Sequence, residues 1–284
     1  FVISVMYDNF PGVNYRPGLE QAGVVYEALA EGGITRLMAL FDSTQEVKNF
    51  GPIRSIRPYF IDWASEYGGA VMHVGGSNEA LQKIKDVDLE DIDQIGADEL
   101  YFTRDENYEA PHNVFSSFSS WLKFAERLSV QPSQVTPWKF AQTPLDQAVS
   151  ERQQVTIEFA PSNEVAWAFN KMNNTYVRFL NGDRQLHTTG DQIAASNLVL
   201  IEVQSETIDT IGRQKMKTLG QGEALIYMNG VERKARWIKE TRASRMRLLS
   251  ESQEEIVLTP GVTWIEVVPS LEITTYETFT SESQ

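Results

Sequence analysis

Residues 58–83, which run PYFIDWASEYGGAVMHVGGSNEALQK, decide the fold. Pro58 stands where a first-turn proline is tolerated, and apolar side chains follow it at helical spacing, so the stretch begins with a predicted helix. Residues 70–74 then predict a short buried strand, Gly75-Gly76 a tight turn, and Ser77 the N-cap of a second helix. A helix, a strand and a second helix in this order are typical of a layered α/β unit.

The rest of the N-terminal half has the same composition of short apolar runs and amphipathic segments. The runs 2–7, 23–30 and 34–42 predict strands, the last two as a hairpin or strand pair, with a helix across 23–30 as the alternative. Residues 118–128 predict another amphipathic helix. The acidic residues 86–93 predict a solvated loop, since they lack the central glycine and closing glutamate of a calcium loop. We therefore expect an α/β layered domain over residues 1–130.

The hydrophobic pattern of the sequence changes after a proline-rich stretch. Residues 131–154 contain Pro132, Pro137 and Pro144 among Gln, Ser and Thr without a sustained period, which predicts a linker. Short alternating segments follow, and Asn-Gly pairs at 181–182 and 229–230 are strong hairpin signals. Residues 155–270 should thus form a mostly antiparallel β domain, and the whole chain an α+β protein.

The end of the chain is expected to contribute little to the core. The last predicted strand covers 263–268, and residues 271–284 form an acidic tail rich in Ser and Thr.

Composition excludes several classes of protein. The chain has 25 Lys and Arg against 39 Asp and Glu, a net charge of −14, which repels a nucleic-acid backbone and excludes nonspecific nucleic-acid binding. No window approaches eighteen consecutive apolar residues. The absence of Cys excludes disulfides, and three His without an H-x-x-x-H pair make a structural zinc site unexpected, so we predict no metal or other cofactor. Because the sequence opens at Phe1 inside an apolar run, we expect a signal peptide or lipid-bearing cysteine to have been trimmed upstream.

Three polar clusters are candidates for a ligand site. The first is residues 51–59, where Arg54 and Arg57 stand at a predicted helix start. Unpaired N–H groups at a helix N-terminus and the guanidinium fork both favour phosphate or carboxylate. The alternative is that both arginines pair with some of the 39 carboxylates and brace the domain.

The second cluster is His73 with Gly75, Gly76 and Ser77, where a glycine turn lets a ligand approach the backbone closely. The alternative is a hydrogen-bonded histidine in the core. The second cluster has neither the dinucleotide-binding fingerprint nor a P-loop lysine, so it gives no direct sign of nucleotide binding.

The third cluster is Arg104 followed by His112 and Asn113 in a loop, where functional residues are common. The alternative is that His112 and Asn113 cap the helix that follows. Asp8, at the end of the first predicted strand, is one of several carboxylates that could serve as an acid or base. No G-x-S-x-G elbow is present.

Seven segments follow one another in the N-terminal half: MYDN (6–9), RPGL (16–19), VYEA (25–28), EGGITR (31–36), GPIRSIRP (51–58), HVGGS (73–77) and APHN (110–113). The C-terminal half contains GEALI (222–226), WIK (237–239) and PGVTWIEVVP (260–269). Together the two sets resemble the N-terminal and C-terminal parts of the YerB-like family of bacterial surface lipoproteins. The resemblance implies an extracytoplasmic protein tethered to the cell membrane by a lipid. It supplies no established reaction, and residues 14–17 depart from the Ala-Arg-Pro type of stretch expected there.

Asp8, the paired arginines and the Gly-Gly turn also occur in an order similar to that in the LytR-CpsA-Psr phosphotransferases, which act on lipid-linked pyrophosphates. This second resemblance is weaker, because the individual motifs do not match.

Two functional hypotheses follow from the sequence. The first is an envelope binding protein whose N-terminal domain recognises an anionic ligand or a protein partner, with the β domain as a platform for protein contacts. The second is an envelope enzyme, a phosphotransferase or hydrolase, with Arg54, Arg57 and Arg104 stabilising charge and an Asp or His as base.

Overall fold

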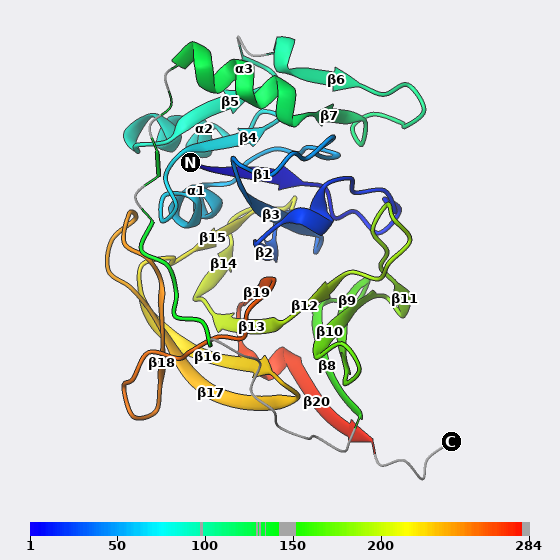
Figure 1. Cartoon of the computed structure of the whole chain (residues 1–284), viewed down its shortest axis with the longest axis vertical. Coiled ribbons are helices and arrows are strands. Elements are labelled where there is room, and N and C mark those ends of the chain that lie inside the picture. Colours follow the sequence, from blue (N-terminus) through cyan, green and yellow to red (C-terminus); the bar gives the residue numbers. More distant parts are fainter. Residues whose placement is uncertain (97–98, 129, 131, 134, 142–151, 280–284) are drawn as a thin grey trace.

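A computed structural model describes residues 1–96, 99–128, 130, 132–133, 135–141 and 152–279. The chain is an α+β protein built on one ten-stranded sheet that runs through both halves of the sequence (Figure 1). From edge to edge its strands are β18 (Arg247–Ser250), β17 (Val231–Lys239), β16 (Gly220–Met228), β13 (Asn197–Glu202), β19 (Thr263–Val268), β2 (Val24–Leu29), β3 (Thr35–Asp42), β1 (Val2–Tyr7), β4 (Ala70–His73) and β5 (Glu90–Asp93).

The pairing in this sheet is mixed in the N-terminal half and mostly antiparallel in the C-terminal half. β1 lies between antiparallel β3 and parallel β4. β19 lies between β13 and β2 and is parallel to both. A strand that comes late in the chain therefore joins the two halves into one continuous sheet.

A second, six-stranded sheet is formed by the C-terminal half. It contains β11 (Asp183–Arg184), β10 (Thr175–Leu180), β9 (Asn163–Asn170), β8 (Arg152–Ala160) and β20 (Thr274–Phe279), with β12 (Ala194–Ala195) paired to β10. Two small hairpins complete the strands, β6 (Phe102–Arg104) with β7 (Val114–Ser116), and β14 (Ser205–Thr207) with β15 (Gln214–Met216).

The helices are few and short. They are α1 (Pro58–Ala64), α2 (Asn78–Lys83) and α3 (Phe118–Leu128), with 3-10 turns η1 (Leu19–Gln21), η2 (Ile84–Asp86), η3 (Glu99–Tyr101) and η4 (Leu271–Ile273). Pro58 occupies the first turn of α1, and the Ser77 hydroxyl accepts from the Ala80 N–H to cap α2, both as predicted. No helix in the described residues is long and apolar enough to cross a membrane.

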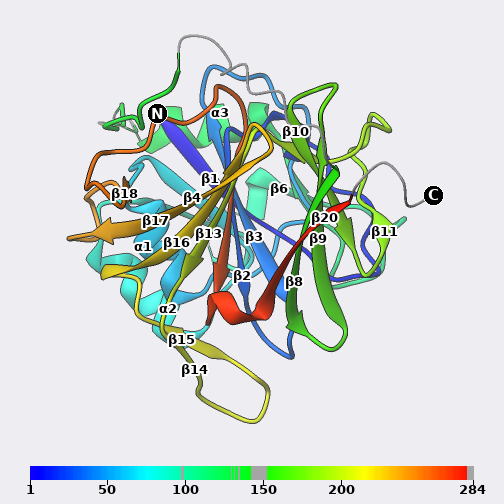
Figure 2. The same cartoon turned by 90° about the horizontal axis from the view of Figure 1, so that it is seen from below.

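The large sheet has a hydrophobic core on each face, because successive side chains of a strand point to opposite sides. Val5 and Tyr7 pack on the face covered by the six-stranded sheet and α3, whereas Met6 packs on the face covered by α1 and α2. Figure 2 shows these layers, with α1 and α2 on one side of the large sheet and β8, β9, β10 and β20 on the other.

Most of the predicted elements are present. The strands at residues 2–7, 23–30 and 34–42 form, the last two as an antiparallel pair, so the helix considered for 23–30 is wrong. The Asn-Gly turns at 181–182 and 229–230 connect hairpins, with positive φ at both asparagines.

Two predictions about loops are wrong. The acidic stretch 86–93 contains β5, because its backbone pairs with β4 along one side and Ile92 enters the core. The tail contains β20, whose backbone pairs with β8, so 263–268 is not the last strand. Of the predicted linker, residues 142–151, Pro144 among them, lie outside the described residues, while Trp138 is buried and donates to the Met246 carbonyl.

Candidate functional site

Asp8, Arg54 and His112 meet at one place, although they lie far apart in sequence. The Asp8 carboxylate, at the end of β1, lies 2.6 Å from His112 Nδ1 and 3.3 Å from Arg54 Nε, both measured from Oδ2. The Asp8 side chain is 5% exposed, against 21% for Arg54 and 25% for His112. The carboxylate is therefore buried beneath a cation and an imidazole that solvent can reach.

Backbone pairing explains why these three side chains converge. Residues 53–56 run between the ends of β1 and β4, since the Arg54 N–H donates to the Met6 carbonyl and the Arg54 carbonyl accepts from the Val74 N–H. His112 comes from the loop between β6 and β7, which the Arg54 guanidinium holds by donating to the Pro111 carbonyl at 2.8 Å. The Phe10 ring stacks on the His112 ring with centroids 5.1 Å apart.

A group of three guanidiniums lies along the same segment, and we call Arg36, Arg54 and Arg57 the arginine cluster. Arg57 forms a close ion pair with Glu31, and Arg36 lies 3.3 Å from the same carboxylate. Arg36 also donates to the Ser55 carbonyl at 2.8 Å. Burial, followed by the positive charge of Arg57, lowers the pKa of Arg36 to about 10. The pairing alternative thus matches both Arg57, which pairs with Glu31, and Arg54, which pairs with Asp8, yet the cluster has three cations for these two carboxylates.

Arg104 and Asn113 lie next to this site in the β6–β7 hairpin. Arg104 donates to Asn113 Oδ1 at 3.0 Å and to Gln94 Oε1 at 3.2 Å, and its side chain is exposed. The helix-capping alternative for His112 and Asn113 is wrong, because β7 intervenes and Ser117 accepts from the Ser120 N–H at the start of α3.

His73 and the glycine turn are engaged in local structure. The ring of His73 is fully buried, with Nε2 2.7 Å from Asp91 Oδ1 and Nδ1 2.9 Å from the Gly75 carbonyl, so it connects β4 to β5. Gly75 has φ 59°, and a Cβ on Gly76 would lie 3.0 Å from Ile56 Cγ2. With Ser77 capping α2, this geometry matches the structural alternative, and a ligand role for these four residues stays a prediction.

A buried polar network, which the sequence analysis did not identify, lies behind the site. Arg178 of β10 donates to both Glu27 oxygens of β2, at 2.8 and 3.0 Å, and both side chains are almost completely buried. Asn9, Thr35 and Trp264 also donate to Glu27, and Glu266 of β19 stands beside Glu27 in the parallel register. We call Glu27, Arg178 and Glu266 with these donors the inter-sheet network, because it fills the space between the two sheets.

The sequence carried a signal for this network. Glu27 and Glu266 each stand inside an apolar strand, and Arg178 lies on the same buried side of β10 as Tyr176 and Leu180, two residues from each. Charged residues on the buried side of a period-2 pattern must find partners.

Arg16 connects the inter-sheet network to the exposed site. Its Nε donates to the Asp8 carbonyl at 2.8 Å and its Nη1 to Gln185 at 3.3 Å. Burial, followed by the charge of Arg178, lowers the pKa of Arg16 to about 10. Arg16 therefore holds the loop that carries Asp8 from the buried side.

The chemistry available at the site is anion binding, with an acid–base pair beside it. A carboxylate that holds one imidazole nitrogen fixes the orientation of the other, which is the arrangement that prepares a histidine to accept a proton. In the described residues, no hydroxyl makes a hydrogen bond to His112, and no group of three or more metal-ligating side chains was found.

Comparisons with known proteins agree with each other. Residues 2–131 match the N-terminal domain, and residues 155–265 the C-terminal domain, of the protein of unknown function DUF3048. The chain is 28% identical over 277 residues to a Bacillus subtilis (strain 168) protein named "Putative lipoprotein YerB", covering 95% of this chain and 82% of that protein. The crystal structure of the YerB protein from Bacillus subtilis superposes with a TM-score of 0.86 at 26% identity, covering 97% of this chain and 93% of that one.

Proposed function

The chain belongs to the DUF3048 family, as its YerB-like segments predicted, and on that basis we propose that it is an extracytoplasmic binding protein for an anionic envelope ligand. The ligand site is the arginine cluster together with Asp8 and His112. The name of the Bacillus subtilis relative supports a place at the cell membrane, with a lipid anchor as its attachment.

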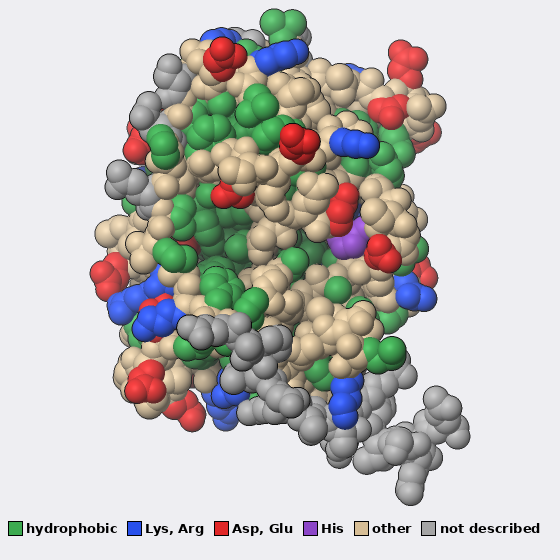
Figure 3. All heavy atoms as spheres, viewed as in Figure 1, with side chains coloured by type: hydrophobic (Ala, Val, Ile, Leu, Met, Phe, Trp, Pro, Cys, Tyr) green, Lys and Arg blue, Asp and Glu red, His purple; other side chains and the backbone are tan. Residues whose placement is uncertain are grey.

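The observation that carries this proposal is the charge of the site. Three partly buried guanidiniums share two carboxylates, in a protein whose net charge is −14. A partly buried cation without a full counter-charge is unfavourable, and a bound anion would balance it. On the face in Figure 3, acidic and basic side chains are scattered in small groups, so on that face the negative charge forms no single patch.

A phosphate or pyrophosphate group fits this site best. Guanidinium groups bind phosphate oxygens through paired N–H donors, and a protonated His112 would add a further donor. An exposed Phe10, stacked on His112, would give the rim an apolar surface for whatever carries the phosphate.

Thermal unfolding with inorganic pyrophosphate tests the proposal. A ligand that binds only the folded protein stabilises it by RT ln(1 + [L]/Kd), so the midpoint should rise with pyrophosphate concentration. We expect the rise to disappear in Arg54→Gln and to remain in Arg247→Gln, a control that removes an exposed arginine paired with Glu240. An equal rise in all three proteins, or none in the unmodified protein, would contradict the proposal.

One observation favours the alternative, an envelope phosphotransferase or hydrolase. The 2.6 Å contact between Asp8 and His112 is the arrangement of an oriented general base. Turnover of p-nitrophenyl phosphate that is lost in His112→Gln, but not in Arg247→Gln, would favour an enzyme over a binding protein.

A further inference from the structure

Exposed apolar side chains gather on the loops around the arginine cluster. In the described residues, the isoleucines that are exposed are Ile95, Ile208 and Ile211, at 70%, 47% and 60%, and Phe10 is 42% exposed. A single exposed apolar side chain is ordinary, whereas several at one place indicate a contact surface.

The direction of the strands places these four side chains at one end of the large sheet. β1, β4 and β5 are parallel to one another, and β2 runs the same way, because β1 and β2 are both antiparallel to β3. β13 and β19 are parallel to β2 as well. The loops that follow β1, β5 and β13 therefore share the end where ligands of open α/β sheets commonly bind, and they carry Phe10, Ile95 and the β14–β15 hairpin with Ile208 and Ile211.

The β14–β15 hairpin lies against a turn that belongs to the arginine cluster. The Gly32 N–H donates to the Ile211 carbonyl at 3.1 Å. Gly32 follows Glu31, the carboxylate that pairs with Arg36 and Arg57. The hairpin therefore projects from the body of the molecule beside the cluster (Figure 2).

The turn that carries Ile95 is held against the segment of the arginines. Ile95 packs on Gly75, where an added Cβ would lie 2.7 Å from Ile95 Cδ1. The Gly75 carbonyl accepts from the N–H of Ile56, which stands between Arg54 and Arg57 in the sequence.

The third loop adds Phe10, whose ring stacks on the ring of His112 beside Asp8. The exposed apolar side chains of the three loops thus stand at the margin of the arginine cluster, and we call them the apolar rim: Phe10, Ile95, Ile208 and Ile211. Cluster and rim together form a cationic centre with an apolar margin.

Carboxylates on the neighbouring strands and loops limit what can carry the bound anion. They are Asp91, Asp93, Asp105, Glu106, Glu109 and Asp209. Asp93 accepts from the Ile95 N–H and Asp209 pairs with Arg213, but Glu106 and Glu109 are exposed. A carrier with many negative charges would be repelled by them, whereas a hydrocarbon chain has no charge and would gain from the apolar rim.

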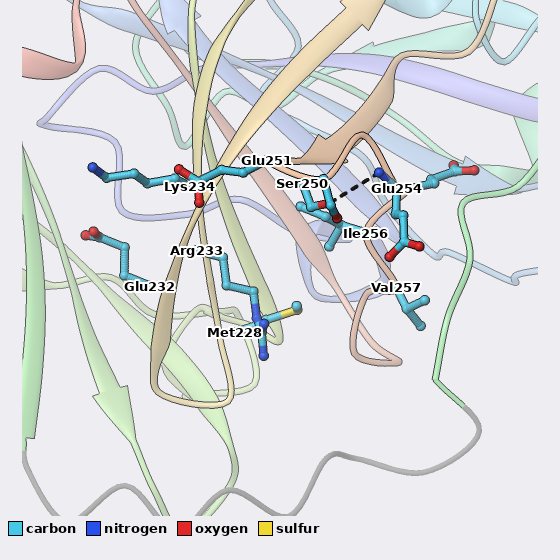
Figure 4. A pocket seen from close by; sticks show the side chains of 11 residues that line it. Met228, Glu232, Arg233, Lys234, Ser250, Glu251, Glu254, Ile256 and Val257 are labelled. Atoms are coloured by element: carbon cyan, nitrogen blue, oxygen red, sulfur yellow. Dashed lines mark hydrogen bonds between the residues drawn. The ribbon is translucent and has the colours of Figure 1, made fainter.

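A cavity elsewhere in the molecule does not discriminate between ligands in this way. It measures about 660 Å³ and lies between β17 and the turn formed by residues 250–257 (Figure 4). Its charged side chains are Arg233, Lys234, Glu232, Glu251, Glu254 and Glu255. Because charges of both signs line this cavity, they favour no one class of ligand.

We propose that the anion held by the arginine cluster is the phosphate head group of a lipid, and that the first part of its hydrocarbon chain lies on the apolar rim. This inference rests on the proposed function and adds the class of molecule that carries the phosphate. The guanidiniums bind the phosphate oxygens, and each methylene that the rim covers adds to the affinity.

Calorimetric titration with two phosphate monoesters tests this inference. Methyl phosphate and octyl phosphate have the same head group, and octyl phosphate would be used below its micellar concentration. We expect the unmodified protein to bind octyl phosphate at least about tenfold more tightly, the gain expected from burying about two methylene groups. Octyl glucoside, which has the chain without the phosphate, should bind much more weakly than octyl phosphate.

Variants of the apolar rim separate the chain from the head group. Replacing Ile95 and Ile211 together by Gln should reduce the gain to within about threefold. The double variant should bind methyl phosphate as the unmodified protein does, which also shows that it is folded. Met172→Gln is the matched control and should keep the full gain. Met172 is 95% exposed in the turn between β9 and β10, where Asn174 donates to Asn229 at the opposite end of the large sheet.

The outcomes separate this inference from the proposed function. Equal affinity for the two esters, or a full gain in the double variant, would overturn the inference and leave the anion site in place. Octyl glucoside that binds as tightly as octyl phosphate, or octyl phosphate that binds Arg54→Gln unchanged, would overturn it because the head group is then not recognised. Absence of octyl phosphate binding would also overturn it, and the proposed function fails as well only where inorganic pyrophosphate does not bind.

Discussion

The inter-sheet network and the arginine cluster are built from the same residue types and lie on either side of Arg16, but they differ in their charge balance. In the inter-sheet network, Glu27 accepts from Arg178 at two points and from three neutral donors, all of them buried. In the arginine cluster, three guanidiniums share two carboxylates, and the outer side chains reach solvent. The comparison indicates that the first region fixes the packing of the two sheets, while the second can still accept a ligand.

The net charge of the inter-sheet network depends on whether the Glu266 carboxyl holds a proton. Burial, and then the negative charge of Glu27, raise the pKa of Glu266 well above its ordinary value. Glu266 accepts from Trp167 Nε1 at 2.8 Å, and a proton on its carboxyl leaves Glu27 and Arg178 as a matched pair. With that proton, the three side chains of Glu27, Glu266 and Arg178 would together carry no net charge.

The largest loss of stability is expected when the ion pair between Glu27 and Arg178 is broken. Arg178→Met leaves Glu27 buried without its cation, and removing one partner of a buried ion pair costs about 3–5 kcal/mol. Urea unfolding followed by tryptophan fluorescence would measure the loss of stability.

Two control variants sharpen this comparison. Arg247→Met removes an exposed partner of Glu240 and should cost less than about 1 kcal/mol. Replacing Glu27 and Arg178 together by Met should recover much of the loss, because no unpaired charge remains. Equal losses for Arg178→Met and Arg247→Met would show that the inter-sheet network does not hold the sheets together.

A smaller effect, dependent on pH, is expected for Glu266→Gln. Because the pKa of Glu266 is raised in the folded protein, its stabilising contribution is complete below the unfolded pKa of about 4.3 and is lost as pH rises through the folded pKa. Glutamine does not titrate, so the variant should become more stable than the unmodified protein as pH rises, by up to about 1.4 kcal/mol per pH unit. Urea unfolding between pH 4 and 9 would show this divergence, and parallel curves for the two proteins would mean that Glu266 does not hold a proton.

The elements that the sequence predicted correctly are those that depend on local chemistry. Pro58 in the first turn of α1, the Ser77 cap of α2 and the turn at Asn229-Gly230 each depend on residues within a few positions. The strand over 263–268 was also predicted, but not its place beside β2, which lies more than 230 residues away in sequence. Period-2 alternation shows that a strand has a buried face without showing which strand will pair with it.

The same limit applies to the candidate site. Asp8, Arg54 and His112 were each selected from the sequence, yet their convergence depends on pairing between β1, residues 53–56 and the β6–β7 loop. The ion pair of Arg57 with Glu31 likewise joins segments that no local pattern connects. Arg16 and Arg178 were not among the selected site residues, and their partners, which come from other strands and loops, could not be identified from local sequence.

A calorimetric double-mutant cycle tests the central claim most directly, that the arginine cluster forms one anion site. Inorganic pyrophosphate would be titrated into the unmodified protein, Arg54→Gln, Arg57→Gln and the double variant. We predict that each single change weakens binding about tenfold and that the double change costs less than the sum, with a coupling of about 1 kcal/mol. Binding that is unchanged in Arg54→Gln or in Arg57→Gln would contradict a shared site.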